Sequence, residues 1–256
     1  MILVIDVGNT HTVLGLFSGH SLVHSWRIAT HMSRTEDEYG IMLHNLFSYQ
    51  KLSFTLVNGM IISCVVPPML NMILDMAVKY FQVQPLIVGP GIKTGLPILL
   101  DNPREVGADR IVNAVAAYDR YKQELIVIDF GTATTFDCIS AKGEYLGGVI
   151  APGLQISTEA LYQRASKLPR VELHRPKEVV GKNTVHSMQS GIIYGYLSLV
   201  DGLVERLIAE LRFSPLTIAT GGLASLMASN SSVIDKVDEL LTLKGLLKLY
   251  ELNCPA

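Results

Sequence analysis

The sequence predicts an α/β protein made of two similar lobes. Residues 2–10 form an apolar run that ends in an acid, a glycine and small polar residues, and residues 125–135 repeat this arrangement near the middle of the chain. Segments with strand patterning alternate with longer segments in which apolar residues recur at helical spacing. Two copies indicate two related lobes that face each other across a cleft, because a solenoid needs at least three repeats.

The composition is that of a folded globular protein. Of the 256 residues, 49% are hydrophobic and 17% are charged, which supports a large buried core and argues against disorder. The net charge of −2 gives no reason to expect nucleic acid or an anionic membrane as a partner. Since the N-terminus has no basic region and no uncharged apolar run reaches about 18 residues, we expect a cytoplasmic protein without a secretory signal or a membrane span.

The cysteines predict neither a metal site nor a disulfide framework. They are three in number and lie far apart, at Cys64, Cys138 and Cys254. Cys64 and Cys138 fall in apolar runs, so we expect inert buried thiols, which fit a reducing cytoplasm.

The first strand motif covers residues 2–10 and predicts a strand that is buried on both faces. An acid at the end of such a strand, here Asp6, is costly unless it faces a cleft, a metal or a partner. Gly8 permits a tight turn and the close approach of a ligand, and Asn9 and Thr10 add small polar groups. The strand end can therefore hold a phosphate and its cation, although a plain strand and turn is the alternative.

The rest of the first lobe follows from local patterning. Alternation predicts antiparallel strands at residues 12–17 and 22–29. Thr35 and Glu38 have the spacing of a capping box and mark the start of a helix. The glycine-rich segment 89–95 lacks the spacing of a phosphate-binding loop, so we expect a plain loop. Further expected elements are a strand at 60–66, a helix at 69–80 and a short strand at 85–88.

A second informative stretch starts at Asn102. Asn102 suits an N-cap and Pro103 the first helical position, so we expect a helix over residues 103–121. Asp109 lies about 200° around this helix from Ile111, off its apolar stripe. It is either a solvated surface acid paired with an arginine or an acid that faces a cleft and accepts a proton.

The second lobe is expected to repeat the first three strands and then to continue with helices. The expected strands are at 125–130, 136–139, 145–150 and 216–219, and the expected helices at 155–165, 187–211 and 235–252.

Several residues of this lobe allow two readings. Gly221 and Gly222 form either an ordinary turn or a flat surface for an adenine. Thr184 is either the N-cap of the long helix or a ligand-binding residue. Gly191 and Gly195 lie one helical turn apart and predict close packing of another helix, within the chain or across a dimer.

These features suit the binding of a triphosphate between the lobes. Backbone N–H groups at glycine turns bind anions, and carboxylates such as Asp6 and Asp129 can hold Mg²⁺ through water. Phosphoryl transfer then needs mainly positioning, together with one group that accepts the proton of the nucleophile, for which Asp109 is the candidate. The sequence lacks the elbow motif of serine hydrolases.

Four motifs resemble those of type III pantothenate kinases, in order along essentially the whole chain. They are D-V-G-N-T at 6–10, E-V-G-A-D-R at 105–110, D-F-G-T-A-T-T at 129–135 and G-G-V-I-A-P-G at 147–153. The first motif is shared with the wider actin, sugar-kinase and Hsp70 superfamily. Residues 107–110 combined with the second Asp-x-Gly-Thr are specific to the family.

The resemblance implies two ribonuclease-H-like lobes, as in actin-like ATPases, each with a mixed five-stranded sheet flanked by helices. We place the lobes at residues 1–118 and 119–256. The implied activity is the ATP-dependent phosphorylation of the 4′-hydroxyl of pantothenate, the first step of coenzyme A synthesis.

The resemblance also implies the roles of individual residues. Asp109 would be the general base, Asp129 would hold K⁺ or NH₄⁺ alongside Mg²⁺, and Asp6 would hold Mg²⁺ through water. The residues expected to bind ATP are Asp6, Val7, Gly8, Asn9, Thr10, His11, Thr12, Val13, Thr132, Gly221 and Gly222. Those expected to bind pantothenate are Leu100, Gly107, Ala108, Asp109, Arg110 and Thr184.

Family members are dimers in which the partner subunit helps to close the pantothenate pocket, so a homodimer is expected. One departure is Leu100, where the family usually has an aromatic residue, commonly tyrosine, in that pocket. Leucine cannot donate a hydroxyl hydrogen bond, so we expect a somewhat higher KM for pantothenate. The alternatives are another kinase or phosphatase of the superfamily, or a nucleotide-gated regulatory protein with a transcription-accessory role.

Overall fold

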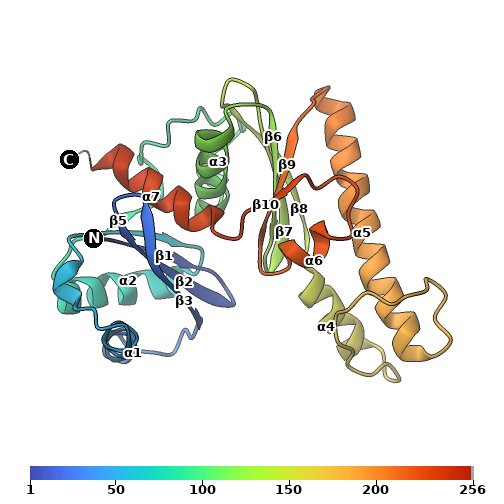
Figure 1. The fold of residues 1–256 in the computed structure, drawn as a ribbon, viewed down its shortest axis with the longest axis horizontal. Helices are drawn as coiled ribbons and strands as arrows, with labels where there is room; N and C mark the ends of the chain where they lie inside the picture. Colours follow the sequence, from blue (N-terminus) through green and yellow to red (C-terminus); the bar gives the residue numbers. More distant parts are fainter. Residues whose placement is uncertain (255–256) are drawn as a thin grey trace. The chain divides into compact units, whose positions relative to one another are not determined.

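The computed structural model describes residues 1–254 and contains two five-stranded sheets, each with helices packed on it (Figure 1). The chain divides into two compact units. The first comprises Met1–Arg120 together with the segment from Leu240 onward, and the second comprises Tyr121–Glu239. Both sheets are mixed, so the predicted α/β fold with a five-stranded mixed sheet in each half of the molecule is confirmed.

The sheet of the first unit is centred on the first strand motif. Its strand order is β3-β2-β1-β4-β5, where β1 is antiparallel to β2 and parallel to β4. Because β1 lies between two strands and is covered on both faces, its apolar run is buried as predicted. The strands are β1 (Ile2–Val7), β2 (His11–Ser18), β3 (Ser21–Ala29), β4 (Gly59–Cys64) and β5 (Leu86–Ile87).

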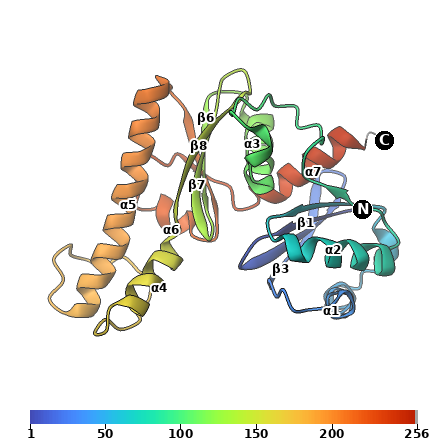
Figure 2. The same cartoon turned by 180° about the vertical axis from the view of Figure 1, so that it is seen from behind.

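Two pairs of helices cover this sheet (Figure 2). Helices α1 (Glu36–Tyr49) and α2 (Pro67–Met76) lie on one face, over a core that includes Leu3 and Ile5. Helices α3 (Ala108–Tyr121) and α7 (Leu241–Asn253) lie on the other face. The short helices of this unit are η1 (Phe54–Leu56), η2 (Ala77–Phe81) and η3 (Pro103–Glu105).

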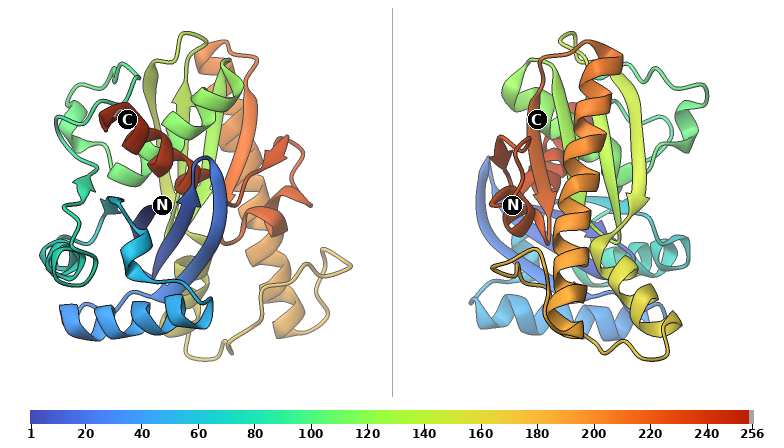
Figure 3. Two further views of the ribbon diagram at one scale, coloured as in Figure 1. Left: turned by 60° about the vertical axis from the view of Figure 1, so that its left-hand side comes forward. Right: turned by 90° about the vertical axis from the view of Figure 1, so that its right-hand side faces the viewer.

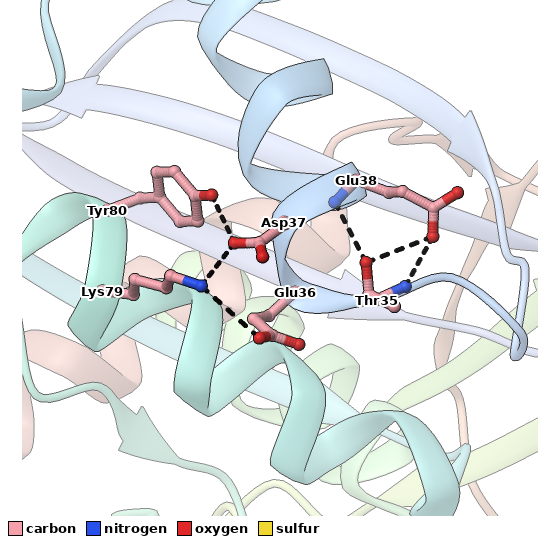
Figure 4. A network of polar contacts seen from close by, with 6 residues as sticks. All are labelled: Thr35, Glu36, Asp37, Glu38, Lys79 and Tyr80. Atoms are coloured by element: carbon pink, nitrogen blue, oxygen red, sulfur yellow. Dashed lines mark hydrogen bonds and ion pairs between the residues drawn. The ribbon is translucent and has the colours of Figure 1, made fainter.

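A polar network ties α1 to the helical turn η2, which continues α2 with π-helical geometry (Figure 4). The predicted capping box of Thr35 and Glu38 is present at the start of α1. In the same first turn, Asp37 Oδ1 accepts a hydrogen bond from the Tyr80 hydroxyl at 2.5 Å and pairs with Lys79 Nζ at 2.5 Å. The network thus joins helices on the same face of the sheet.

The second unit repeats the topology of the first. Its strand order is β10-β9-β6-β7-β8, and β6 is antiparallel to β7 and parallel to β9, as β1 is to β2 and β4. The predicted repeat is therefore present in three dimensions. The strands are β6 (Leu125–Phe130), β7 (Ala133–Ile139), β8 (Tyr145–Pro152), β9 (Leu216–Gly221) and β10 (Lys236–Val237).

The long helix α5 (Thr184–Leu211) runs along one face of this second sheet (Figure 3). Its buried residues, among them Ile193 and Val200, pack against Ile126 and Ile128 of β6. Two shorter helices, α4 (Leu154–Arg164) and α6 (Ala224–Ala228), complete the unit.

The structure differs from the expected elements in three places. The helix predicted over residues 103–121 is broken at Val106, which has extended backbone angles and separates η3 from α3. The predicted helix over 235–252 begins only at Leu241, because residues 236–237 instead form β10 beside β9. Finally, the expected boundary assigned α7 to the second lobe, at residues 119–256. In the structure α7 instead packs on Val4 and Ile61 of the first unit.

Cys138 is buried as expected, but Cys64 is only half-buried and Cys254 is exposed. None of the helices within residues 1–254 is long and apolar enough to cross a bilayer.

Candidate functional site

The turn between β1 and β2 carries the first acidic strand end. Asp6 is half-buried, and in the sheet it lies between Val13 of β2 and Ser63 of β4. The Gly8 N–H donates to the His11 carbonyl oxygen at 3.0 Å and closes the turn, with Asn9 exposed at its tip. A Cβ atom at Gly8 would itself lie 3.0 Å from that oxygen, so glycine allows the turn to be this tight.

Two threonines, Thr12 and Thr30, lie next to this turn and stabilise it. Thr30 Oγ1 donates to the Gly8 carbonyl oxygen at 2.7 Å and lies 3.0 Å from Thr12 Oγ1, and Thr12 is almost fully buried. The Thr30 N–H donates to the Thr10 carbonyl oxygen at 3.0 Å. Thr30 therefore stabilises the expected binding loop, although no sequence pattern singled this residue out. Pairing of β3 with β2, a tertiary contact, brings Thr30 there.

Asp109 lies in the first turn of α3 because the helix begins only at Ala108. Its Oδ1 atom accepts a hydrogen bond from the Arg110 N–H at 2.9 Å. A Cβ atom at Gly107 would lie 2.6 Å from the same oxygen, so only glycine leaves room for the carboxylate there.

Burial raises the pKa of the Asp109 carboxyl above its ordinary value, and the N–H and the charge of Arg110 oppose this. Asp109 is half-buried, which favours the reading of an acid that faces a cleft. A desolvated carboxylate at the start of a helix is suited to accept a proton.

Contacts of α7 show which end of this helix lies near the carboxyl end of β1. Near the start of α7, Leu243 lies against Gly15, which pairs with Val4 in the middle of β1. Near the end of α7, Tyr250 lies against Gly59, the first residue of β4. The first turn of α7 is therefore nearer the carboxyl end of β1.

The first turns of α3 lie beside the start of α7. Thr242 Oγ1 donates to Asn113 Oδ1 at 2.8 Å, and Asn113 follows Asp109 by about one helical turn. Asp109 and Asp6 are thus brought toward the same end of the first unit. Arg110 and Leu100, two further expected site residues of this unit, are both half-buried.

The turn at the second acidic strand end is one residue shorter than the first. The Gly131 N–H donates to the Ala133 carbonyl oxygen, two residues on, at 3.1 Å, whereas the Gly8 N–H donates to His11, three residues on. The Gly153 N–H, at the start of α4, donates to the Thr132 carbonyl oxygen at 3.2 Å. A Cβ atom at Gly153 would overlap that oxygen, so glycine lets α4 begin directly against the turn.

The structure brings Gly221 next to Asp129. Phe130 of β6 pairs with Gly221 of β9, and Asp129 pairs with Thr220. A Cβ atom at Gly221 would lie 2.5 Å from Asp129 Oδ1, and Gly221 has a φ of +90°, which favours glycine. Gly221 therefore does more than form an ordinary turn, because it provides the space that the Asp129 carboxylate occupies.

Tyr196 is a further polar residue near this strand end, and no local pattern in the chain indicates its position there. Its hydroxyl oxygen lies 2.5 Å from Thr134 Oγ1 and 3.0 Å from the Pro152 carbonyl oxygen. Burial raises the pKa of this phenol, while the contact with Thr134 lowers it. Tyr196 thus links α5 to β7 and β8.

Thr184 lies apart from the other expected residues of the second unit. It is the exposed first residue of α5, and its expected role as N-cap is wrong because the Asn183 side chain accepts from the His186 N–H at 2.9 Å. Tyr196, which contacts Thr134 and Pro152, is twelve residues further along α5. At 1.5 Å per residue, Thr184 lies about 18 Å from Tyr196 along the helix axis.

Among residues 1–254, no three His, Cys, Asp or Glu side chains form a cluster that could hold a metal ion. Asp6 and Asp129 lie near the ends of the central strands β1 and β6. Such sites fit Mg²⁺, which keeps most of its water and is bound through one or two carboxylates and substrate phosphates.

Solved structures with low sequence identity share this fold. A Campylobacter jejuni protein described as a Baf family transcriptional activator superposes with a TM-score of 0.60 at 18% identity, covering 97% of each chain. A Sinorhizobium meliloti protein described as a 2-dehydro-3-deoxygalactonokinase gives a TM-score of 0.58 at 11% identity, covering 100% of this chain and 98% of its own. At these identities the similarity concerns the fold alone.

Sequence relatives identify the family. The family profile described as "Type III pantothenate kinase" matches residues 2–206. A type III pantothenate kinase of Syntrophus aciditrophicus is 60% identical over 99% of this chain and 100% of its own. One of Myxococcus xanthus is 57% identical over 99% of both chains, and one of Halalkalibacterium halodurans is 59% identical over 99% of this chain and all of its own. The chain therefore belongs to the type III pantothenate kinase family.

Proposed function

We propose that this chain transfers the γ-phosphoryl group of ATP to the 4′-hydroxyl of pantothenate, the first step of coenzyme A biosynthesis. Family membership over 99% of the chain supports the reaction. The observation that carries the mechanism is the position of Asp109, a half-buried acid in the first turn of α3 that lies toward the same end of the unit as Asp6.

Asp109 acts as the general base. The pKa of its carboxyl is raised by burial, which makes it a better proton acceptor than a solvated aspartate, while the N–H and the charge of Arg110 oppose that rise. As the hydroxyl of pantothenate attacks the γ-phosphorus, Asp109 accepts its proton. Gly107, Ala108 and Arg110 bind the substrate beside it, and the Arg110 guanidinium supplies a positive charge that suits the pantothenate carboxylate.

ATP is bound by the acidic strand ends and their turns. A kinase of this family uses ATP and a divalent metal, and Mg²⁺ supplies neutralisation of phosphate charge when it is bound. Asp6 would hold that ion through water, and Gly221 and Gly222 would lie against the adenine. The remaining ATP-binding residues of the proposal are Val7, Gly8, Asn9, Thr10, His11, Thr12, Val13 and Thr132.

Asp129 holds a monovalent cation, K⁺ or NH₄⁺. Its carboxylate lies against the backbone of Gly221, so a cation there would also meet the carbonyl-rich ends of β6 and β9. A weakly hydrated monovalent ion suits one carboxylate surrounded by backbone oxygens.

The active enzyme is a homodimer to which each partner contributes Thr184. Thr184 lies about 18 Å along α5 from Tyr196, the residue that contacts Thr134 just after the Thr132 turn, and this favours a contribution of Thr184 from a second copy. In addition, α4 and α5 border an apolar cavity of about 440 Å³, and Gly191 and Gly195 line it with no neighbour within 4 Å of their Cβ positions. This open face between the two helices suits a helix of the partner subunit.

The test is an ADP-release assay with the full-length protein. We expect turnover with pantothenate in the presence of K⁺ or NH₄⁺, and none with hexoses or acetate. No turnover with pantothenate under these conditions would contradict the proposed reaction. Light scattering in solution measures the oligomeric state, and a monomer with full activity would contradict the shared pocket.

The net charge of −2 and the absence of any expected basic patch also support a cytoplasmic enzyme that binds neither nucleic acid nor membranes. A gel-shift assay with random-sequence DNA checks the first of these expectations.

A further inference from the structure

One buried hydroxyl group in the first unit has no role in the function described above. Ser63 lies in β4 and is 0% exposed. Its Oγ atom has no hydrogen-bond partner among residues 1–254. Buried hydroxyl groups in folded proteins are nearly always hydrogen-bonded, so this one requires an explanation.

The sheet register places Ser63 directly beside Asp6. Strands β1 and β4 are parallel, and Asp6 pairs with Ser63. Paired residues of a parallel ladder point their side chains to the same face, and neighbouring strands lie about 4.8 Å apart. The face is the one that carries Val4 and Ile61 and is covered by α3 and α7. The Ser63 hydroxyl is thus one strand spacing from the Asp6 carboxylate.

Within the sheet, the other side chains next to Ser63 on this face are apolar. Val88, whose N–H donates to the Ile62 carbonyl oxygen at 2.9 Å, follows β5 on the opposite side and is buried. Ile61 precedes Ser63 on the same face, and Ala108 of α3 packs against the same core. Asp6 is therefore the side chain beside Ser63 in the sheet that can accept its hydrogen bond.

We propose that Ser63 is a positioning residue for Asp6, an inference that rests on the proposed role of Asp6 in holding Mg²⁺ through water. In the nucleotide-bound enzyme the Ser63 hydroxyl donates to one carboxylate oxygen of Asp6. The other oxygen is then free to accept from the water shell of the ion. Because a hydrogen bond to a carboxylate is short and directional, it holds the Asp6 side chain in one rotamer.

The first experiment compares Ser63→Ala with the wild-type enzyme. We expect the Kd for the magnesium complex of ADP, measured by titration calorimetry, to rise about tenfold or more, as loss of a charge-assisted hydrogen bond predicts. The KM for MgATP should rise in parallel, with the KM for pantothenate unchanged. The thermal midpoint should stay equal or increase, since the free protein loses no hydrogen bond. A lower midpoint with unchanged ADP affinity would mean a purely structural role and would overturn the inference.

The matched control is Ser25→Ala, which removes an exposed hydroxyl from β3 of the same sheet. It should leave both the ADP affinity and the thermal midpoint unchanged. An equal loss of affinity in this control would overturn the assignment to Ser63.

A double-mutant cycle with Asp6→Asn separates this inference from the proposed function. If Ser63 acts through Asp6, the double variant should bind MgADP no more weakly than Asp6→Asn alone. Additive losses would overturn the inference. If Asp6→Asn weakens binding and Ser63→Ala does not, only the role of Ser63 fails. If Asp6→Asn binds as the wild type does, the proposed role of Asp6 fails, and the inference fails with it.

Discussion

Replacement of Gly221 by alanine should disturb the second acidic strand end in a way that the structure quantifies. Gly221 has a φ of +90°, and a Cβ atom there would lie 2.5 Å from Asp129 Oδ1 and 2.7 Å from the Phe130 carbonyl oxygen. The positive φ alone costs an alanine about 1–2 kcal/mol. Forcing the Asp129 carboxylate and the β6 backbone aside adds about 1–3 kcal/mol, as in other overpacked sites.

Gly19→Ala provides a matched control for this substitution. Gly19 also has a positive φ, of +56°, but its Cβ position has no neighbour within 4 Å. The Gly19→Ala variant should therefore lose only the stability that an alanine loses by adopting a positive φ. At about 2–4 °C per kcal/mol for a chain of this size, we expect Gly221→Ala to melt several degrees below Gly19→Ala.

Activity assays separate the two variants further. If Asp129 holds the monovalent cation, Gly221→Ala should raise the K⁺ concentration needed for half-maximal activity by about tenfold or more, since the carboxylate has moved. Gly19→Ala should keep the wild-type cation dependence. Equal melting temperatures and equal cation dependence in the two variants would refute both the geometry and the role of Asp129.

Three further outcomes are expected from single substitutions. Asp109→Asn should lower kcat at least about a hundredfold. Because burial raises the pKa of Asp109, the charged form of this side chain destabilises the fold at neutral pH. The Asp109→Asn variant should therefore melt no lower than the wild type at pH 7. In the wild type, kcat should fall with decreasing pH through that raised pKa, and a kcat independent of pH down to about pH 4 would contradict the base role. Leu100→Tyr should lower the KM for pantothenate by about two- to tenfold, since one added hydrogen bond contributes about 0.5–1.5 kcal/mol, and an unchanged KM would contradict its place in the pocket. Hydrogen bonds and charge from Lys79 and Tyr80 lower the pKa of Asp37, so its contribution to stability is present above the ordinary aspartate pKa and is lost as pH falls. Asp37→Asn should thus melt below the wild type at pH 7, and the difference should vanish in acid.

Local sequence patterns were sufficient to predict most of the first strands and turns in each half of the chain. The apolar runs before Asp6 and Asp129 become the central strands β1 and β6, and the glycines after them, Gly8 and Gly131, close the turns that follow. The capping box at Thr35 is likewise present. These features depend on neighbours within a few residues, which is why they can be read from the chain itself.

The break before α3 was not predictable from such patterns. Asn102 and Pro103 are good helix starters, and they do start a short helix, η3. Gly107, however, lets the Asp109 carboxylate fold over the start of a second helix, α3, and this places Asp109 in its first turn. Local helix propensity alone cannot choose between one long helix and two short ones when a side-chain contact decides.

The sequence by itself determined the repeated strand–turn unit, the α/β class and the motifs that identify the kinase family, because strand periodicity and glycine turns act over short distances. Only the tertiary structure decided that Thr30 supports the Gly8 turn, that Ser63 lies beside Asp6, and that α7 completes the first unit. Each of these depends on pairing between segments that are distant in the chain. Such pairing is selected by the packing of whole strands and helices, and no single residue carries a local signal for it.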